Sequence, residues 1–120
     1  MKENILEIEK YAKENNVPII EKDSICYIMQ YIKEHNVKSI LEIGSAIGYS
    51  SILMASSNPD TVVTTIERDE QRYMECLKNI KKCGLDKKIN VVYQDALELN
   101  LTGVSYDLIF IDAAKGQYTK

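Results

Sequence analysis

The chain has 120 residues, a length that fits one domain with a real hydrophobic core. Its composition, 45% hydrophobic and 28% charged, is that of a soluble globular protein, and a net charge of −3 gives no general attraction to nucleic acid. No apolar run approaches the ~20 residues of a membrane span, and the acidic start, Met1–Glu7, lacks the apolar segment of a signal peptide. We therefore expect a single cytoplasmic domain over residues 1–120 with no membrane partner.

The cysteines Cys26, Cys76 and Cys83 form no CxxC pair, and each falls in a helical pattern. An odd number of unpaired cysteines in helices is typical of a protein from a reducing compartment. We expect reduced, mostly buried thiols rather than metal ligands.

Two amphipathic helices open the chain. The first covers residues 3–15 and ends before Pro18, which disfavours the helical conformation at the preceding residue. The second follows Asp23 or Ser24 as its N-cap and ends near residue 35. The residues expected to face inward are Ile5, Ile8, Tyr11 and Ala12 in the first helix and Ile25, Ile28, Met29 and Ile32 in the second.

From residue 38 onward, strands alternate with helices. We expect strands over 38–43, 61–66, 89–93 and 106–111, helices over 49–57 and 70–83, and a short helical turn or loop over 96–99. Asp69 is the predicted N-cap of the helix over 70–83, whose inward face is Tyr73, Leu77 and Ile80. The alternation predicts an α/β fold with a parallel sheet, in which residues 1–36 are a helical lead-in and 37–120 the core.

The chain ends a few residues after the predicted fourth strand. A parallel sheet that stops there leaves an edge strand with no neighbour and an uncovered face. We expect either that the chain is part of a larger domain or that something else covers this edge.

A small-residue turn, Gly44 to Gly48, joins the first strand to the helix that begins at Tyr49. A strand that ends in a glycine turn and continues as a helix is expected to bring bare backbone N–H groups and a helix N-terminus to one edge of the sheet. In open α/β sheets this edge binds ligands.

Three acids lie where strands end: Glu42, Glu67 and Asp95. Because the carboxyl ends of parallel strands share one rim, we expect these carboxylates to line one crevice, with the acid closing the second strand placed to hold a ribose diol. Any one of them alone is equally well explained as a helix cap or a solvated loop residue. Together with the glycine turn, they indicate a nucleoside site.

The ligand is better matched by S-adenosylmethionine than by a dinucleotide. Ala46 occupies the middle position of GxGxxG, and Glu42 would lie beside a pyrophosphate, anion against anion. No Gly-Lys-Ser/Thr follows the turn, which excludes a P-loop. S-adenosylmethionine carries a ribose, an adenine, an ammonium and a sulfonium, and its positive charges would be attracted to Glu42.

Segments 41–50, 65–67 and 106–118 resemble the metal-dependent class I O-methyltransferases, a family that includes catechol and caffeoyl-CoA O-methyltransferases and bacterial enzymes acting on 5-hydroxyuridine in tRNA. Residues 16–20 resemble the bacterial branch, where this loop lies over the cofactor. The resemblance implies a Rossmann-like fold with helices on both faces, whose last strands are missing here. It also implies S-adenosylmethionine and Mg²⁺ as cofactors and a homodimer.

By position, the resemblance implies that Glu42 and Gly44 contact the methionine part of the cofactor, Ser50 its carboxylate, and Glu67 the ribose, with Asp95 and Ala96 beside the adenine. The full implied cofactor-binding set is Glu42, Gly44, Ser45, Ala46, Gly48, Ser50, Glu67, Arg68, Asp95, Ala96 and Asp112.

The resemblance also makes Asp112 a catalytic metal ligand and Lys115 the catalytic base. A divalent cation lowers the pKa of a bound hydroxyl, and a lysine three residues from the ligand can take the proton. The family's other metal ligands, an Asp-Asn pair, come from a later strand. We therefore expect this chain to bind cofactor weakly and not to turn over.

Several alternatives stay open from the sequence. The acceptor is either a hydroxylated tRNA uridine or a small catechol-like phenol. The chain could instead be a non-catalytic module that binds an adenosine ligand, and an NAD-dependent oxidoreductase is a third reading. Basic residues around Gly84 form either an RNA-facing patch or an ordinary solvated helix end. They are Arg68, Arg72, Lys78, Lys81, Lys82, Lys87 and Lys88.

Overall fold

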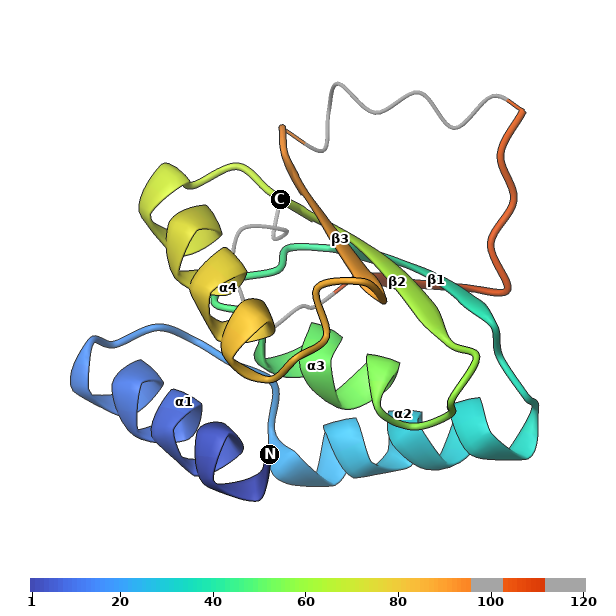
Figure 1. Ribbon diagram of the computed structural model, residues 1–120, viewed down its shortest axis with the longest axis horizontal. Helices are drawn as coiled ribbons and strands as arrows, with labels where there is room; N and C mark the ends of the chain where they lie inside the picture. The colour runs from blue at the N-terminus through green and yellow to red at the C-terminus, as the bar shows by residue number, and fades with distance from the viewer. Residues whose placement is uncertain (96–102, 112–120) are drawn as a thin grey trace.

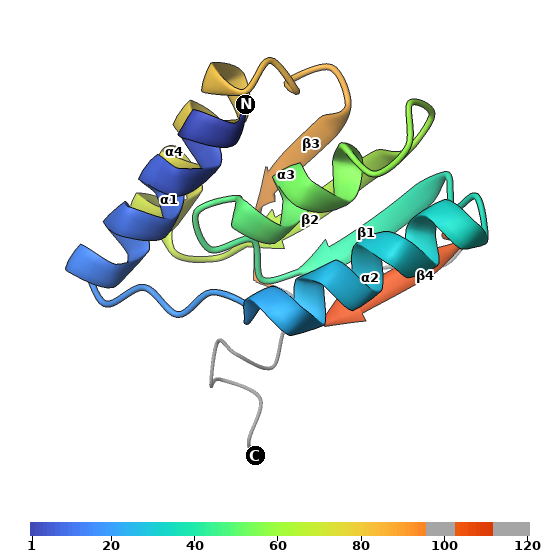
Figure 2. The same cartoon turned by 90° about the horizontal axis from the view of Figure 1, so that it is seen from below.

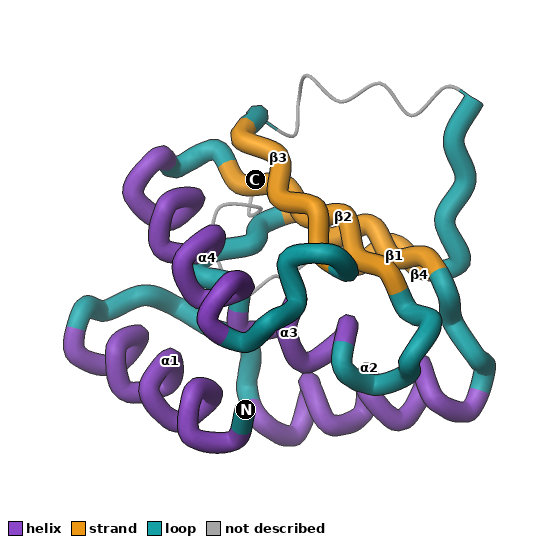
Figure 3. Tube along the Cα trace, viewed as in Figure 1, coloured by secondary structure: helices purple, strands orange, loops and turns teal. Residues whose placement is uncertain are grey.

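A computed structural model of the chain describes residues 1–95 and 103–111. Four parallel strands form one sheet in the order β3-β2-β1-β4 (Figures 1 and 3). The strands are β1 (Ser39–Ile43), β2 (Val62–Glu67), β3 (Ile89–Tyr93) and β4 (Leu108–Ile111). The predicted parallel α/β fold is confirmed, and β1 lies at its centre, paired with β2 and β4.

Four helices accompany the sheet: α1 (Lys2–Glu14), α2 (Lys22–Glu34), α3 (Tyr49–Ala55) and α4 (Glu70–Lys82). They lie on one side of the strands, with α1 beside α4 and α2 beside α3 (Figures 1 and 2). We expected helices on both faces of the sheet. In the part of the chain that the structure describes, the helices cover one face. None of the described helices has the length and apolar character that crossing a membrane requires.

The main core lies between the helices and the sheet. Ile8 and Ala12 of α1 and Ile25 and Ile32 of α2 are buried in it, as their helical spacing predicted. A smaller apolar cluster, built on Leu41, Ile43 and Ile66, lies on the opposite face of the sheet. Ile40 of β1 and Val63 of β2 belong to the main core, so successive side chains of these strands lie on opposite faces of the sheet.

Two local predictions about helices are wrong. α2 begins after Glu21, not after Asp23 or Ser24; Asp23 lies in the first turn, where its charge favours the helix dipole. In α4, Ile80 is buried as predicted and Tyr73 is half-buried, but Leu77 is exposed, and Cys76 and Asn79 complete the buried face. The predicted Asp69 cap is confirmed, since its carboxylate accepts a hydrogen bond from the Arg72 N–H at 3.0 Å.

β4 is apolar throughout, from Leu108 to Ile111, and lies at one edge of the sheet, as predicted. Its Ile109 and Ile111 are 51% and 56% exposed. The thiols also differ from expectation: Cys76 is buried, Cys83 is half-buried and Cys26 is exposed. All three are free.

Candidate functional site

The glycine turn after β1 is fixed by the end of β2. The Gly44 and Ser45 N–H groups both donate to the Ile66 carbonyl, at 2.8 and 3.0 Å, and the Gly48 N–H donates to the Ser45 carbonyl at 3.0 Å. The expectation that the turn offers bare N–H groups is therefore wrong for these three residues, because the neighbouring strand end and the turn itself satisfy them. Hydrogen bonds from within the chain thus define the path of the turn.

Gly48 is the residue at which the turn becomes α3. Its φ of +92° is in the left-handed region that side chains disfavour. A Cβ at this position would lie 3.1 Å from the Cys76 sulfur of α4. The Asn79 side chain, also on α4, donates to the Ile47 carbonyl at 2.8 Å. Close approach of α4 to the turn therefore explains why glycine stands here and why Cys76 faces inward.

Glu42 is completely buried beneath this turn. One carboxylate oxygen accepts a hydrogen bond from the Ser50 hydroxyl. The other accepts hydrogen bonds from the Ser51 hydroxyl and, at 2.6 Å, from the Thr65 hydroxyl. Ser45 and Thr65 also share a hydrogen bond of 2.6 Å. Glu42 and these four hydroxyl residues form what we call the hydroxyl network, which joins β1, β2, the turn and α3.

Glu67 closes β2 and is only 7% exposed. One carboxylate oxygen accepts the Ala46 N–H at 2.7 Å, and the other accepts the Asp69 N–H at 3.0 Å. Ala46 itself has a positive φ of +49°. Each carboxylate oxygen has two acceptor positions, so both oxygens of Glu67 keep acceptor capacity for a ligand hydroxyl.

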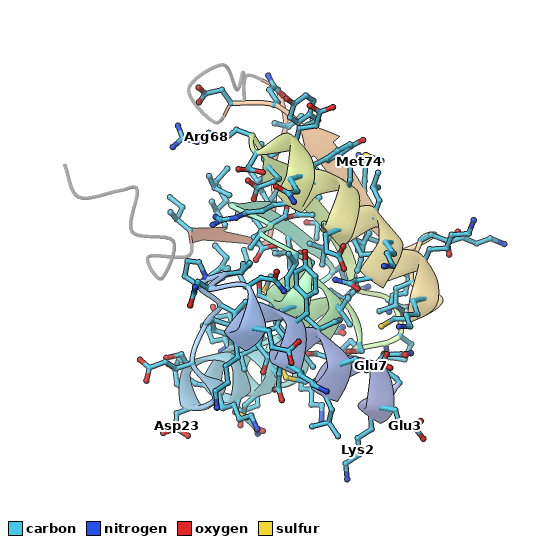
Figure 4. The ribbon with its side chains drawn as sticks, turned by 90° about the vertical axis from the view of Figure 1, so that its left-hand side faces the viewer. Lys2, Glu3, Glu7, Asp23, Arg68 and Met74 are labelled. Atoms are coloured by element: carbon cyan, nitrogen blue, oxygen red, sulfur yellow. The ribbon has the colours of Figure 1, made fainter. Side chains whose placement is uncertain are left out.

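The other predicted site residues lie at the same rim or outside the described residues. Asp95 follows β3 and is half-buried, and the Gln94 N–H donates to the Glu67 carbonyl at 3.0 Å. Arg68 lies beside the start of α4, far from Lys2 and Glu3 (Figure 4). The structure thus gathers the glycine turn, Glu42, Ser50 and Glu67 closely. Ala96, Asp112 and Lys115 are outside the described residues.

Sequence reasoning missed Thr65 and Ser51, which hold Glu42. A signal for Thr65 was present, because strand alternation places Thr65 on the same face as Val63 and Glu67, inside the core. A hydroxyl at an inward strand position needs a partner, and the buried acid of the neighbouring strand supplies it.

The lead-in helices are tied to the turn through Tyr49, the first residue of α3. The buried Tyr49 hydroxyl donates to the Glu9 carboxylate of α1 at 2.7 Å, and Glu9 also lies 3.7 Å from the Lys22 ammonium of α2. Burial first, and then the Glu9 carboxylate, raise the pKa of Tyr49 well above its usual value. The site is thereby connected to both N-terminal helices.

Two lysines of the basic run around Gly84 bind other groups of the same chain. The Lys88 ammonium donates to the Ala55 and Asn58 carbonyls, at 2.6 and 2.9 Å, and so caps the end of α3. Lys82 forms an ion pair of 2.7 Å with Glu7. These contacts favour the reading in which the run is mainly a structural and solvated helix end.

Metal-binding side chains do not gather in the described residues. Over residues 1–95 and 103–111, no three His, Cys, Asp or Glu side chains lie close enough to hold an ion. The predicted ligand, Asp112, is outside those ranges.

Comparison with known proteins identifies the family of the chain. A sequence model of a family described as O-methyltransferase matches residues 2–120. The chain belongs to the O-methyltransferase family. This O-methyltransferase chain is 34% identical over 119 residues to Tapetum-specific methyltransferase 1 of Arabidopsis thaliana, covering 92% of this chain and 50% of that protein.

Solved structures have the same fold. A candidate caffeoyl-CoA O-methyltransferase from Staphylococcus aureus is 42% identical, with a TM-score of 0.85 over 92% of this chain and 54% of that one. An O-methyltransferase from Bacillus cereus, solved in complex with SAH, is 24% identical, with a TM-score of 0.81 and the same coverage, and shows the fold alone. The chain spans about half the length of these relatives.

Proposed function

We propose that this chain is the S-adenosylmethionine-binding half of an O-methyltransferase. The observation that carries the proposal is the buried Glu67 carboxylate, which two backbone N–H groups hold at the rim beside the glycine turn. A fixed carboxylate with acceptor capacity remaining suits a ribose diol. Family membership and the SAH complex of the Bacillus cereus protein support the same ligand.

The charge of the site favours a cationic ligand over a dinucleotide. Glu42 lies under the turn with three hydroxyl donors and forms no ion pair with any residue of 1–95 or 103–111, so a pyrophosphate above it would meet an anion that no cation there compensates. The ammonium and sulfonium of S-adenosylmethionine would be attracted instead. Glu42 would act through the Ser50 hydroxyl, since the carboxylate itself is buried. This argument disfavours both an NAD-dependent oxidoreductase and nucleotide hydrolysis.

The remaining cofactor contacts of the proposal come from the turn and the rim: Gly44, Ser45, Ala46, Gly48, Ser50, Arg68, Asp95 and Ala96. We propose Asp112 as a Mg²⁺ ligand and Lys115 as the base that takes the proton of the acceptor hydroxyl, by resemblance to the family. When bound, the cation would lower the pKa of that hydroxyl.

For the acceptor, a small catechol-like phenol is favoured by the caffeoyl-CoA description of the Staphylococcus aureus relative. A hydroxylated tRNA uridine is the second candidate, and the exposed Lys78 and Lys81 of α4 are the observation in its favour. A homodimer, suggested by the exposed end of β4, and a cytoplasmic location, suggested by three free cysteines, are further parts of the proposal.

Calorimetric titration of the 120-residue chain with S-adenosylmethionine, SAH and NAD tests the cofactor. We expect the two adenosyl ligands to bind with or without Mg²⁺, and NAD not to bind. Glu67→Gln should weaken binding, whereas Asp86→Asn, an acid beyond the far end of α4, should not. Binding of NAD in preference to S-adenosylmethionine would refute the proposal. We expect no methyl transfer to catechol, and metal-dependent turnover would contradict that expectation.

A further inference from the structure

Three consecutive residues with hydroxyl side chains begin α3, and each donates a hydrogen bond to a carboxylate. Ser50 and Ser51 donate to Glu42, which lies beneath the turn on β1. Tyr49 donates at 2.7 Å to Glu9, which belongs to α1. The first turn of α3 is therefore held by one carboxylate from the sheet and by a second from the N-terminal helices.

Glu9 uses both of its carboxylate oxygens to join three helices. Its Oε2 atom accepts the Tyr49 hydroxyl of α3, and its Oε1 atom lies 3.7 Å from the Lys22 ammonium at the start of α2. Tyr49 is buried, so loss of this acceptor would leave a polar group without its partner, which costs more than the bond itself contributes. The N-terminal helices thus act directly on the residue that begins α3.

The contact between Glu9 and Tyr49 bears on one end of the proposed cofactor site. Tyr49 directly precedes Ser50, the residue proposed to contact the methionine part of the ligand. The proposed ribose acid, Glu67, is held by other elements, since its donors are the N–H groups of Ala46 and Asp69, neither of which belongs to α1, α2 or α3. A displacement of the first turn of α3 would therefore move Ser50 and leave the ribose acid in place.

We propose that Glu9, acting through Tyr49, is a positioning residue that sets the affinity of the chain for the methionine end of the cofactor. The inference rests on the proposed function, because Ser50 must contact that end of the ligand. Glu9 itself touches no ligand atom; it holds the helix turn that does. A side chain that a supporting hydrogen bond fixes in advance loses less freedom when the ligand binds.

Calorimetric titration of the 120-residue chain with S-adenosylmethionine, SAH and adenosine tests this role, because adenosine lacks the amino-acid part. Tyr49→Phe and Glu9→Met should each bind S-adenosylmethionine and SAH about three- to ten-fold more weakly, the effect of one hydrogen bond. Both variants should bind adenosine within about two-fold of the parent chain. The double variant should bind no more weakly than the weaker single variant, since both changes remove the same contact.

Two further variants are matched controls. Glu7→Met makes the same substitution on α1 and removes an exposed ion pair of 2.7 Å with Lys82 of α4, so all three affinities should equal those of the parent chain. Glu9→Gln keeps an acceptor oxygen for the Tyr49 hydroxyl and should retain most of the affinity for S-adenosylmethionine.

The two proposals fail in different ways. If the folded parent chain binds none of the three ligands, the proposed function falls and the role of Glu9 with it. If the parent chain binds them, and Tyr49→Phe and Glu9→Met weaken adenosine as much as S-adenosylmethionine or weaken neither, only the positioning role is refuted. Should Glu9→Met not fold, Tyr49→Phe is compared with Glu7→Met, and the same difference between the ligands decides.

Discussion

The Thr65 hydroxyl on β2 donates a hydrogen bond of 2.6 Å to the Glu42 carboxylate on β1. Both residues are completely buried, and they are register neighbours on adjacent strands. A buried carboxylate needs all of its donors, because the charge is otherwise left unsolvated. This pair therefore holds the two strands from which the glycine turn and the predicted ribose acid emerge.

Replacement of Thr65 by valine tests that relationship. The shapes of the two side chains match, so the loss should be that of a hydrogen bond to a charged group, about 1.5–3 kcal/mol in the free energy of unfolding. Thr65→Ser, which keeps the hydroxyl, is the control and should be distinctly more stable than Thr65→Val. Urea unfolding measures both. Equal stability of the two variants would show that Thr65 does not support the carboxylate.

Gly48→Ala should destabilise the chain more than Gly84→Ala does. Both glycines have positive φ, which costs an alanine about 1–2 kcal/mol. At Gly84 an added Cβ would meet no atom within 4 Å, whereas at Gly48 it would lie 3.1 Å from the Cys76 sulfur. Crowding should add about 1 kcal/mol or more at Gly48. Thermal or urea unfolding gives the difference.

A double mutant tests whether contact with Cys76 causes the additional loss of stability in Gly48→Ala. Cys76→Ala removes the sulfur, so part of the loss caused by Gly48→Ala should be recovered in the Cys76→Ala background. Strictly additive effects would mean that the close approach of α4 does not limit position 48.

Stability should depend on Tyr49 at alkaline pH. Because burial and Glu9 raise the pKa of Tyr49 in the folded chain, the unfolded chain loses that proton first as pH rises. The contribution is thus fully present below pH ~10 and decreases above it, by up to about 1.4 kcal/mol per pH unit.

Urea unfolding between pH 8 and 11 measures this dependence. Tyr49→Phe should flatten the decline relative to the parent chain, and Tyr27→Phe, at a tyrosine that is 73% exposed, should leave it unchanged. Parallel profiles for the parent chain and Tyr49→Phe would refute the assignment.

Replacement by methionine should destabilise the chain at one lysine of the basic run and not at another. Lys88→Met removes two hydrogen bonds to the carbonyls that follow α3 and should reduce the free energy of unfolding by about 1–3 kcal/mol. Lys82→Met removes only an exposed ion pair with Glu7, so we expect no measurable change. A larger loss at Lys82 than at Lys88 would reverse our assignment of structural roles.

The strands and their direction followed from local pattern, and β3 was predicted with its observed bounds because β-branched residues are bracketed there by turns. The Asp69 cap was equally local. The inward face of α4 could not be read from its sequence, because Leu77 is more hydrophobic than Cys76, and only the approach of Gly48 decides between them.

The polar interior of the site depends still more on tertiary structure. The sequence indicated that Glu42 and Glu67 share a rim, but not that hydroxyls from β2 and α3 surround Glu42. Nor did it indicate that N–H groups of the turn donate hydrogen bonds to the end of β2. These contacts join residues that only the packed sheet brings together.

The position of β4 has a consequence for the order in which the sheet is assembled. The Asp107 N–H reaches the Ser39 hydroxyl across 68 residues of chain, whereas Thr65 and Glu42 are separated by 23. Closing the shorter loop costs less chain entropy, so β1, β2 and β3 can pair before β4 adds to the far side of β1. Amide protons of β4, at the edge and joined last, should therefore exchange with solvent sooner than those of β1, while the glycine turn is already closed.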